Sequence, residues 1–137
     1  MSTSIQDLYI AGKSDAFFVP DVSLKAKERI GTIRGESYLE DTFEFYERIE
    51  VWIDTFFKAG NQAFTLIFQL NYHNTSSSRA ILGLILKLKK LAEIGNDIKI
   101  IWRYPMPDDN EVLEDGKDFA TDADFPIEFV EVSEANF

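Results

Sequence analysis

Large apolar residues recur at helical spacing between Asp41 and Gly60. Successive members stand four, three and four residues apart and therefore line one face of a helix; they are Phe45, Ile49, Trp52 and Phe56. Asp41 is a favourable N-cap residue, and Glu44 follows three positions later, as in a capping box. The pattern predicts an amphipathic helix that packs on a core and ends at Gly60.

A second helical pattern covers residues 76–94 and is followed by Gly95. At about 100° per residue most of its apolar side chains fall within one broad arc; they are Ile81, Leu84, Ile85, Leu88, Leu91 and Ala92. Leu82 and Leu86 project from the opposite, charged side, which also carries Arg79. Two interpretations of this pair remain open: a ridge on which a partner protein docks, or apolar residues covered by a neighbouring loop.

Apolar runs predict strands before, between and after the two helices. The run from Phe64 to Leu70 is typical of a central strand that is covered on both sides. Residues 98–104 predict a further strand, which we expect Pro105 and Pro107 to stop. The other expected elements are strands at 5–10, 17–25, 28–34 and 125–132, a turn at Lys27-Glu28 and an acidic helix at 109–120. This order predicts a single α/β domain over residues 1–137, with parallel strand pairs and crossover helices.

The charge of the chain is concentrated at its C-terminal end. Residues 107–137 contain eleven acidic residues and one basic residue, Lys117, whereas residues 1–106 contain thirteen of each. The net charge of −10 therefore comes from the C-terminal segment, and it argues against nucleic-acid binding, which needs a basic footprint. The acidic segment is either a solvated surface or a face for a basic partner.

Composition also limits the chemistry and the compartment. The chain has no cysteine, which excludes disulfides, thiolate metal ligands and cysteine nucleophiles and fits a reducing cytosol. The N-terminus lacks a signal-peptide pattern and no apolar stretch is long enough for a bilayer span, so we expect a cytoplasmic protein without membrane insertion. His73 is the only histidine, no nucleotide-binding glycine motif is present, and no pair of carboxylates stands out. We therefore expect no enzymatic activity, no metal and no cofactor.

A polar run from Asn71 to Ser78 separates the most apolar strand from the second helix. Asn74 or Thr75 can cap that helix, but one cap does not require four consecutive hydroxyl groups. The run also follows the carboxyl end of a strand, where open α/β sheets place their sites. A phosphate on Thr75 or a neighbouring serine would lie at the positive end of a helix. The pattern thus leaves both a plain helix cap and a phosphorylation switch open.

Four segments spread over nearly the whole chain carry a family resemblance. They are Gly35-Glu36-Ser37-Tyr38 followed by Glu40-Asp41, then Leu70 to Arg79, then Ile101-Trp102-Arg103-Tyr104, and finally Glu114-Asp115-Gly116-Lys117-Asp118-Phe119. In this order they resemble the SiaC family of bacterial regulatory phosphoproteins, and the most specific element is the Tyr72-x-Asn74-Thr75-Ser76-Ser77 core. The chain departs from the family pattern at Leu39-Glu40, where a proline is expected after the tyrosine. This departure bears on local loop geometry and not on Thr75.

The resemblance implies a fold, a switch and a set of partners. The implied fold is that of anti-sigma-factor antagonists (STAS-like), a small mixed sheet flanked by helices. The family threonine is phosphorylated by a histidine-kinase-like Ser/Thr kinase and dephosphorylated by a PP2C-type phosphatase, and it corresponds to Thr75. In one branch of the family the unphosphorylated protein binds and activates a diguanylate cyclase, which links the switch to cyclic-di-GMP and biofilm formation.

From this resemblance we expect a phosphorylation-controlled, partner-switching protein with Thr75 as the phosphorylation site. The expected partner contacts are Tyr72, Asn74, Ser76, Ser77, Ser78, Arg79, Leu82 and Leu86, and the loop residues Glu36, Ser37 and Tyr38 are expected nearby. One alternative is a small-ligand-binding or other protein-interaction module of the same fold without a phosphoswitch. The other is a hydrolase that uses His73 or the acidic helix.

Overall fold

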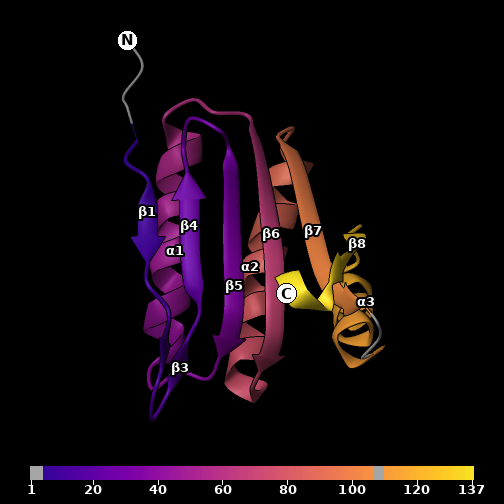
Figure 1. Ribbon diagram of the computed structural model, residues 1–137. Helices are drawn as coiled ribbons and strands as arrows, with labels where there is room; N and C mark the ends of the chain where they lie inside the picture. The colour runs from indigo at the N-terminus through magenta and orange to yellow at the C-terminus, as the bar shows by residue number, and fades with distance from the viewer. Residues whose placement is uncertain (1–4, 107–109) are drawn as a thin grey trace.

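The computed structural model describes residues 5–106 and 110–137, and its centre is a six-stranded sheet (Figure 1). The strand order is β1-β4-β5-β6-β7-β8. Along the chain the strands are β1 (Leu8–Ile10), β4 (Asp21–Lys25), β5 (Ile30–Ser37), β6 (Ala63–His73), β7 (Asp97–Met106) and β8 (Glu128–Ser133). β1, β4 and β5 pair antiparallel, whereas the steps from β5 to β8 are all parallel. A separate antiparallel pair is formed by β2 (Lys13–Ser14) and β3 (Phe18–Val19).

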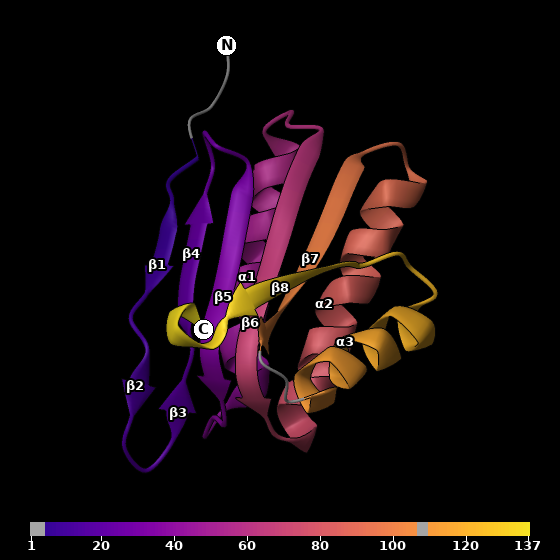
Figure 2. The ribbon, with the colours of Figure 1, turned by 45° about the vertical axis from the view of Figure 1, so that its right-hand side comes forward.

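One helix bridges each parallel step of the sheet. α1 (Thr42–Lys58) joins β5 to β6, α2 (Thr75–Glu93) joins β6 to β7, and α3 (Asn110–Ala123) joins β7 to β8. Figures 1 and 2 show these helices on the same side of the sheet. Parallel neighbours require such crossovers, and the predicted α/β architecture with a mixed sheet is confirmed. No helix within the described ranges is long and apolar enough to cross a membrane.

The core lies between the sheet and the helices. β6 contributes alternate side chains that are almost fully buried, namely Phe64, Leu66, Phe68 and Leu70. α2 contributes Ile81, Leu84, Ile85 and Leu88, and the predicted apolar face of α1 is buried as expected. Full burial of one such side chain stabilises a fold by about 1.5–3 kcal/mol, so this layer holds both helices firmly against the sheet. The positions of their N-termini, where the candidate site lies, follow from this packing.

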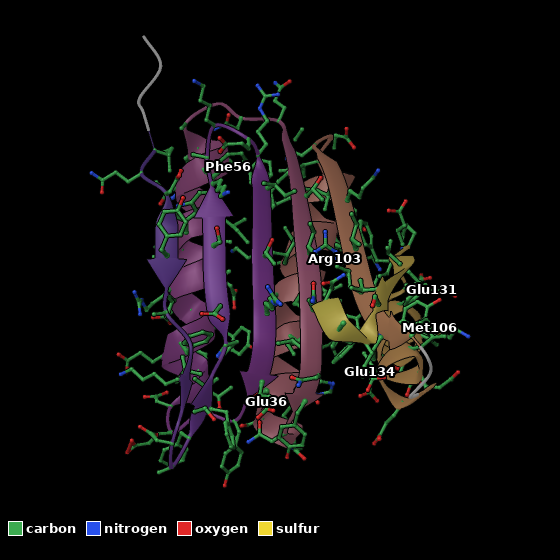
Figure 3. All side chains as sticks on the ribbon, in the orientation of Figure 1. Glu36, Phe56, Arg103, Met106, Glu131 and Glu134 are labelled. Atoms are coloured by element: carbon green, nitrogen blue, oxygen red, sulfur yellow. The ribbon has the colours of Figure 1, made fainter. Side chains whose placement is uncertain are left out.

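The opposite face of the sheet is covered in part by the C-terminal turn η1 (Glu134–Asn136), which lies in front of the sheet in Figure 1. Gln69 of β6 is nearly buried on this face and donates from Nε2 to the carbonyl oxygen of Asn136 at 3.1 Å. Arg103, which Figure 3 shows on the same face, donates from Nη1 to Gln69 Oε1 at 3.2 Å. The middle of β6 is therefore covered on both sides, but the second cover is a turn that the sequence did not predict.

Several element boundaries differ from the predicted ones. β7 continues through Pro105 to Met106, so the prediction that Pro105 stops the strand is wrong. Pro105 lies beyond the last pair between β6 and β7 and pairs only with Val132 of β8, and a strand with a partner on one side tolerates proline. α3 is longer than expected and ends at Ala123. Pro107 and residue 109, the predicted start of that helix, lie outside the described residues.

Candidate functional site

The candidate site lies at the edge of the sheet where the carboxyl ends of β5 and β6 approach the start of α2, at the bottom of Figure 1. The backbone N–H of Asn74 donates to the carbonyl oxygen of Ser37 at 3.1 Å, which holds the end of β6 against the end of β5. The hydroxyl groups of Thr42 and Ser76 lie 2.9 Å apart and join the first turns of α1 and α2. The central strand extends three residues beyond its predicted carboxyl end, because Asn71 to His73 of the polar run belong to β6. The rest of the run, Asn74 to Ser78, caps and opens α2 at the carboxyl end of that strand.

Asn74 fills the capping role at the start of α2. Its Oδ1 accepts hydrogen bonds from the backbone N–H of Ser77 at 3.0 Å and from the Ser76 hydroxyl at 3.3 Å. α2 therefore begins at Thr75, one residue earlier than predicted, and Thr75 takes the first helical position. Because the cap is already supplied, the fold does not need the Thr75 hydroxyl for capping.

The four consecutive hydroxyl groups have different environments. Thr75 is exposed, and within the part of the chain that the structure describes no hydrogen bond involves its hydroxyl. Ser76 is exposed too, but it bonds to Thr42 and Asn74. Ser78 is partly buried and donates to the carbonyl oxygen of Asn74 at 3.1 Å. Thr75 is therefore the hydroxyl of this run that is exposed and has no hydrogen bond to another described residue.

Ser77 belongs to a buried hydroxyl network beneath the site. It donates to the carbonyl oxygen of Ser37 at 2.9 Å and accepts from the Ser37 hydroxyl at 2.7 Å, and both side chains are 0% exposed. The hydroxyl groups of Ser37 and Tyr46 lie 2.8 Å apart. Because the Ser37 proton is used toward Ser77, Tyr46 is the donor in this pair. Burial raises the pKa of Tyr46 to about 12, and the contact with Ser37 opposes that rise only in part.

His73 connects the end of β6 to α3. Its Nδ1 lies 2.8 Å from Ser78 Oγ and its Nε2 lies 3.2 Å from Asp115 Oδ2, although the second contact lacks the alignment of a hydrogen bond. The imidazole is 11% exposed and packs against the rings of Trp102 and Phe119. The Ser78 hydroxyl donates its proton to the carbonyl oxygen of Asn74. The imidazole therefore does not accept the serine proton, as the general base of a hydrolase would. The arrangement supports a structural contact and not a nucleophile.

A groove with a cavity volume of about 290 Å³ lies between the first turns of α1 and α2. It is lined by Thr42, Phe43, Tyr46, Glu50, Ser76, Arg79, Ala80 and Gly83. Phe43 is 76% exposed at its rim, and Arg79 and Glu50 supply its charges. Aromatic residues and arginine are enriched at protein-docking surfaces, and Phe43 and Arg79 supply both at this groove.

The predicted contact residues differ in how far they are exposed. Tyr72 and Arg79 are exposed, whereas Ser77 is fully buried and has a structural role instead of the predicted partner contact. Leu86 is 38% exposed, but Leu82 is partly buried and packs against the core. Of the predicted ridge, Leu86 is therefore the exposed member, and Leu82 belongs to the edge of the core.

The predicted nearby loop is only partly at the site. Ser37 lies inside it, and Glu36 pairs with Tyr72 across the end of β5, where Figure 3 shows it. Tyr38 instead stacks on Phe17, with ring centroids 5.7 Å apart, and bridges to Phe18. It therefore belongs to the β2–β3 side of the molecule.

The residues from α1 were missed, although the sequence contains a signal for one of them. Phe43 stands outside the arc that carries the buried face of α1, and an isolated aromatic residue on a polar helix face is such a signal. Thr42 and Tyr46 carry no local sign of their contacts with Ser76 and Ser37. Those contacts depend on how α1 and α2 pack.

The sequence of the chain also matches a known protein family. The model of the SiaC family regulatory phosphoproteins matches residues 11–132. The chain belongs to this family. The matched range includes the whole site, and the family resemblance of the four sequence segments is confirmed. A protein of Pseudomonas aeruginosa (strain UCBPP-PA14) is 27% identical over 96 residues, which cover 70% of this chain and 75% of that protein.

Solved structures of the family have the same fold. Apo-SiaC from Pseudomonas aeruginosa is 25% identical with a TM-score of 0.80, over 92% of this chain and 99% of that chain. A chain in the crystal structure of the diguanylate cyclase SiaD in complex with its activator SiaC, from the same organism, is 25% identical with a TM-score of 0.82. That match covers 92% of this chain and all of the other. The family is thus one of regulatory phosphoproteins with a member that binds a diguanylate cyclase.

Proposed function

We propose that this protein is a partner-switching regulator whose unmodified form docks an effector at the start of α2 and whose phosphorylation at Thr75 releases it. The observation that carries the proposal is the difference among the four hydroxyl groups. Thr75 is exposed and has no hydrogen-bond partner in the described part of the chain, while its three serine neighbours hold structural contacts. Phosphorylation of Thr75 therefore leaves the fold intact and changes only the surface.

The proposed docking surface consists of Thr75, the groove between α1 and α2, and the exposed stripe of α2. At about 100° per residue Thr75, Arg79 and Leu86 fall within about 40° of one another, so one partner helix or strand can contact all three. A phosphate adds roughly −1.5 to −2 charges at neutral pH, and a docked partner would have to desolvate them. Phe43, Arg79 and Leu86 supply the apolar and cationic contacts that the charge disrupts.

The proposed effector is a diguanylate cyclase, because SiaC of Pseudomonas aeruginosa is the activator of the diguanylate cyclase SiaD. Binding of the unmodified protein would then raise cyclic-di-GMP synthesis and promote biofilm formation. A histidine-kinase-like Ser/Thr kinase adds the phosphate, and a PP2C-type phosphatase removes it. The protein itself acts by binding and carries out no chemistry in this scheme, in the cytoplasm where these enzymes have access to it.

Phosphorylation is tested by incubating the protein with its cognate kinase and mapping the modified residue by mass spectrometry. We expect one phosphate, on Thr75, and none on Thr75→Ala. Ser76→Ala is the matched control, because it removes the other exposed hydroxyl of the run and should be modified fully. Full phosphorylation of Thr75→Ala would refute the site.

Partner control is tested by calorimetry or pull-down with the diguanylate cyclase. Wild type and Thr75→Ala should bind the cyclase alike. Thr75→Asp should bind at least about tenfold more weakly, because a carboxylate that the interface buries without a partner weakens binding by more than about 1.4 kcal/mol. Equal recovery of the cyclase by all three proteins would contradict the switch.

A second candidate, a small-ligand-binding module, is favoured by one observation. A cavity of about 710 Å³ lies between the N-terminal segment and α1, and its walls include Ile5, Leu8, Val51 and Trp52. Its size is within the range of ligand sites. A ligand that changes the fluorescence of Trp52, together with unaltered partner binding by Thr75→Asp, would favour this function over the switch.

A further inference from the structure

Arg79 lies one helical turn after Thr75 on the outward side of α2, and both side chains are exposed. At about 100° per residue the two are about 40° apart, and residues four apart in a helix have Cβ atoms about 5–6 Å from each other. A phosphate on the threonine is therefore within reach of the guanidinium group without any change in the backbone.

The guanidinium group of Arg79 is also unengaged. Within residues 5–106 and 110–137 no ion pair or hydrogen bond involves it, although Glu50 lines the same groove. Two lysines farther along α2 are fixed: Lys87 Nζ lies 2.9 Å from Asp54 Oδ1, and Lys89 Nζ donates to the carbonyl oxygen of Ala123 at 3.1 Å. Arg79 thus keeps its full donor capacity next to Thr75.

The order and chemistry of the pair favour binding. An anion placed four residues before a cation is the favourable order on a helix, and the first turn of α2 holds no acidic residue that would compete. The planar guanidinium group binds phosphate oxygens through two parallel N–H bonds, which an ammonium group does not. We propose that Arg79 is the residue that binds the phosphate on Thr75.

This proposal rests on the proposed phosphorylation of Thr75 and adds a consequence to it. Arg79 lines the groove between α1 and α2 in the unmodified protein. When it pairs with the phosphate, the docking surface loses a free cation at the same time as it gains an anion. Arg79 is then the positioning residue of the switch, because it holds the phosphate over α2 instead of leaving it free in solvent.

The pair is tested on protein that carries phosphothreonine at position 75, installed by genetic-code expansion so that no kinase is needed. A ³¹P NMR titration at low ionic strength measures the second pKa of the phosphate. A paired cation favours the dianion, so that pKa should be lower in the wild-type background than in Arg79→Gln, by about 0.3–0.7 pH units. Arg79→Lys keeps the positive charge but lacks the two parallel N–H donors of the guanidinium group. Its phosphate pKa should therefore lie between those of the wild-type background and Arg79→Gln.

Arg48→Gln is the matched control, because it removes an exposed arginine from α1 that lines the large cavity instead of the groove. It should leave the phosphate pKa as in the wild-type background. Equal phosphate pKa values in the wild-type background and in Arg79→Gln, or an equal rise in Arg48→Gln, would overturn the proposal. The result is independent of the kinase: failure to phosphorylate Thr75 enzymatically refutes the proposed function, whereas an unshifted phosphate pKa refutes only the pairing.

Discussion

The two flanks of α2 differ in how much of their polar surface is already used. On the flank toward α3, Ser78 contacts His73, and Lys89 donates to the end of α3. On the flank toward α1, Lys87 pairs with Asp54 farther along the helix. At the first turns of the two helices, however, the described residues contain one hydroxyl pair beside the groove, and Arg79 has no partner among them. A lysine on each flank holds the later part of α2 in place, whereas at the start of the helix the flank toward α1 leaves groups available for a partner.

The same division applies within the first turn of α2. At about 100° per residue Ser77 falls within about 20° of the buried Leu84 and Leu88, whereas Thr75 lies on the far side of the helix. A hydroxyl group on the inward side forms hydrogen bonds within the fold, whereas one on the outward side is available for modification. The contrast between Ser77 and Thr75 can therefore be tested by placing the same charge at both positions.

The largest expected effect is that of Ser77→Asp, which should lower the free energy of unfolding by about 3–5 kcal/mol because it buries an unpaired carboxylate. Its 0% exposed site faces the carbonyl oxygen of Ser37, which repels a negative charge. Thr75→Asp should instead raise the free energy of unfolding by about 0.3–1 kcal/mol, through the helix dipole. Urea denaturation at low salt measures both, and similar losses for the two variants would disprove the inward–outward distinction.

The next effect concerns the buried hydroxyl network beneath the groove. The pKa of Tyr46 is about 12 in the folded protein, against 10.0 in its ordinary environment. The folded state thus binds the phenol proton more tightly, so its stabilising contribution is complete below pH 10 and is lost as the pH rises toward 12. The difference corresponds to about 2–3 kcal/mol.

Tyr46→Phe is the control for this pH dependence. It should cost about 1 kcal/mol at neutral pH, the value of a typical hydrogen bond, and should remove the extra loss of stability between pH 10 and 12. Denaturation curves at pH 8, 10 and 11 for both proteins provide the measurement. An unchanged slope in Tyr46→Phe would show that other groups cause the alkaline loss.

The periodicity of apolar residues was sufficient to predict the helices, the central strand and the alternating order of strands and helices, because these follow from local patterns of burial. It was also sufficient, in principle, to separate Thr75 from Ser77. The helical phase of Leu84 and Leu88, extended back by two turns, places Ser77 inward. The separation was missed because the helix was expected to begin at residue 76 and the cap residue was left open between Asn74 and Thr75.

Contacts between distant segments could not be predicted in this way. Ser37 and Ser77 are 40 residues apart, Thr42 and Ser76 are 34 apart, and Gln69 meets Asn136 across 67 residues. Each depends on where the packed core places two elements, and no local property of either residue specifies the partner. The groove between α1 and α2 arises from such contacts, which is why Phe43 was not among the predicted site residues.

The smallest expected effects are those of two glycines, one near each flank of α2. A Cβ atom on Gly116 of α3 would lie 2.5 Å from Cδ1 of Trp102. That ring is fully buried and fixed by its hydrogen bond to the carbonyl oxygen of Val112 at 2.8 Å. Gly116→Ala should therefore lose about 1 kcal/mol of stability, since overpacking of about 1–3 kcal/mol outweighs the gain in helix propensity.

Gly83 lines the groove toward α1, and a Cβ atom there would meet nothing within 4 Å. Gly83→Ala should gain about 0.5–1 kcal/mol, because alanine restricts the unfolded chain and favours the helix without a clash. Thermal and urea unfolding of the two variants give the comparison. Opposite signs are expected because the same methyl group meets a packed ring near one flank and open space on the other. A loss of stability in Gly83→Ala would mean that the groove is closed in solution and cannot admit a partner.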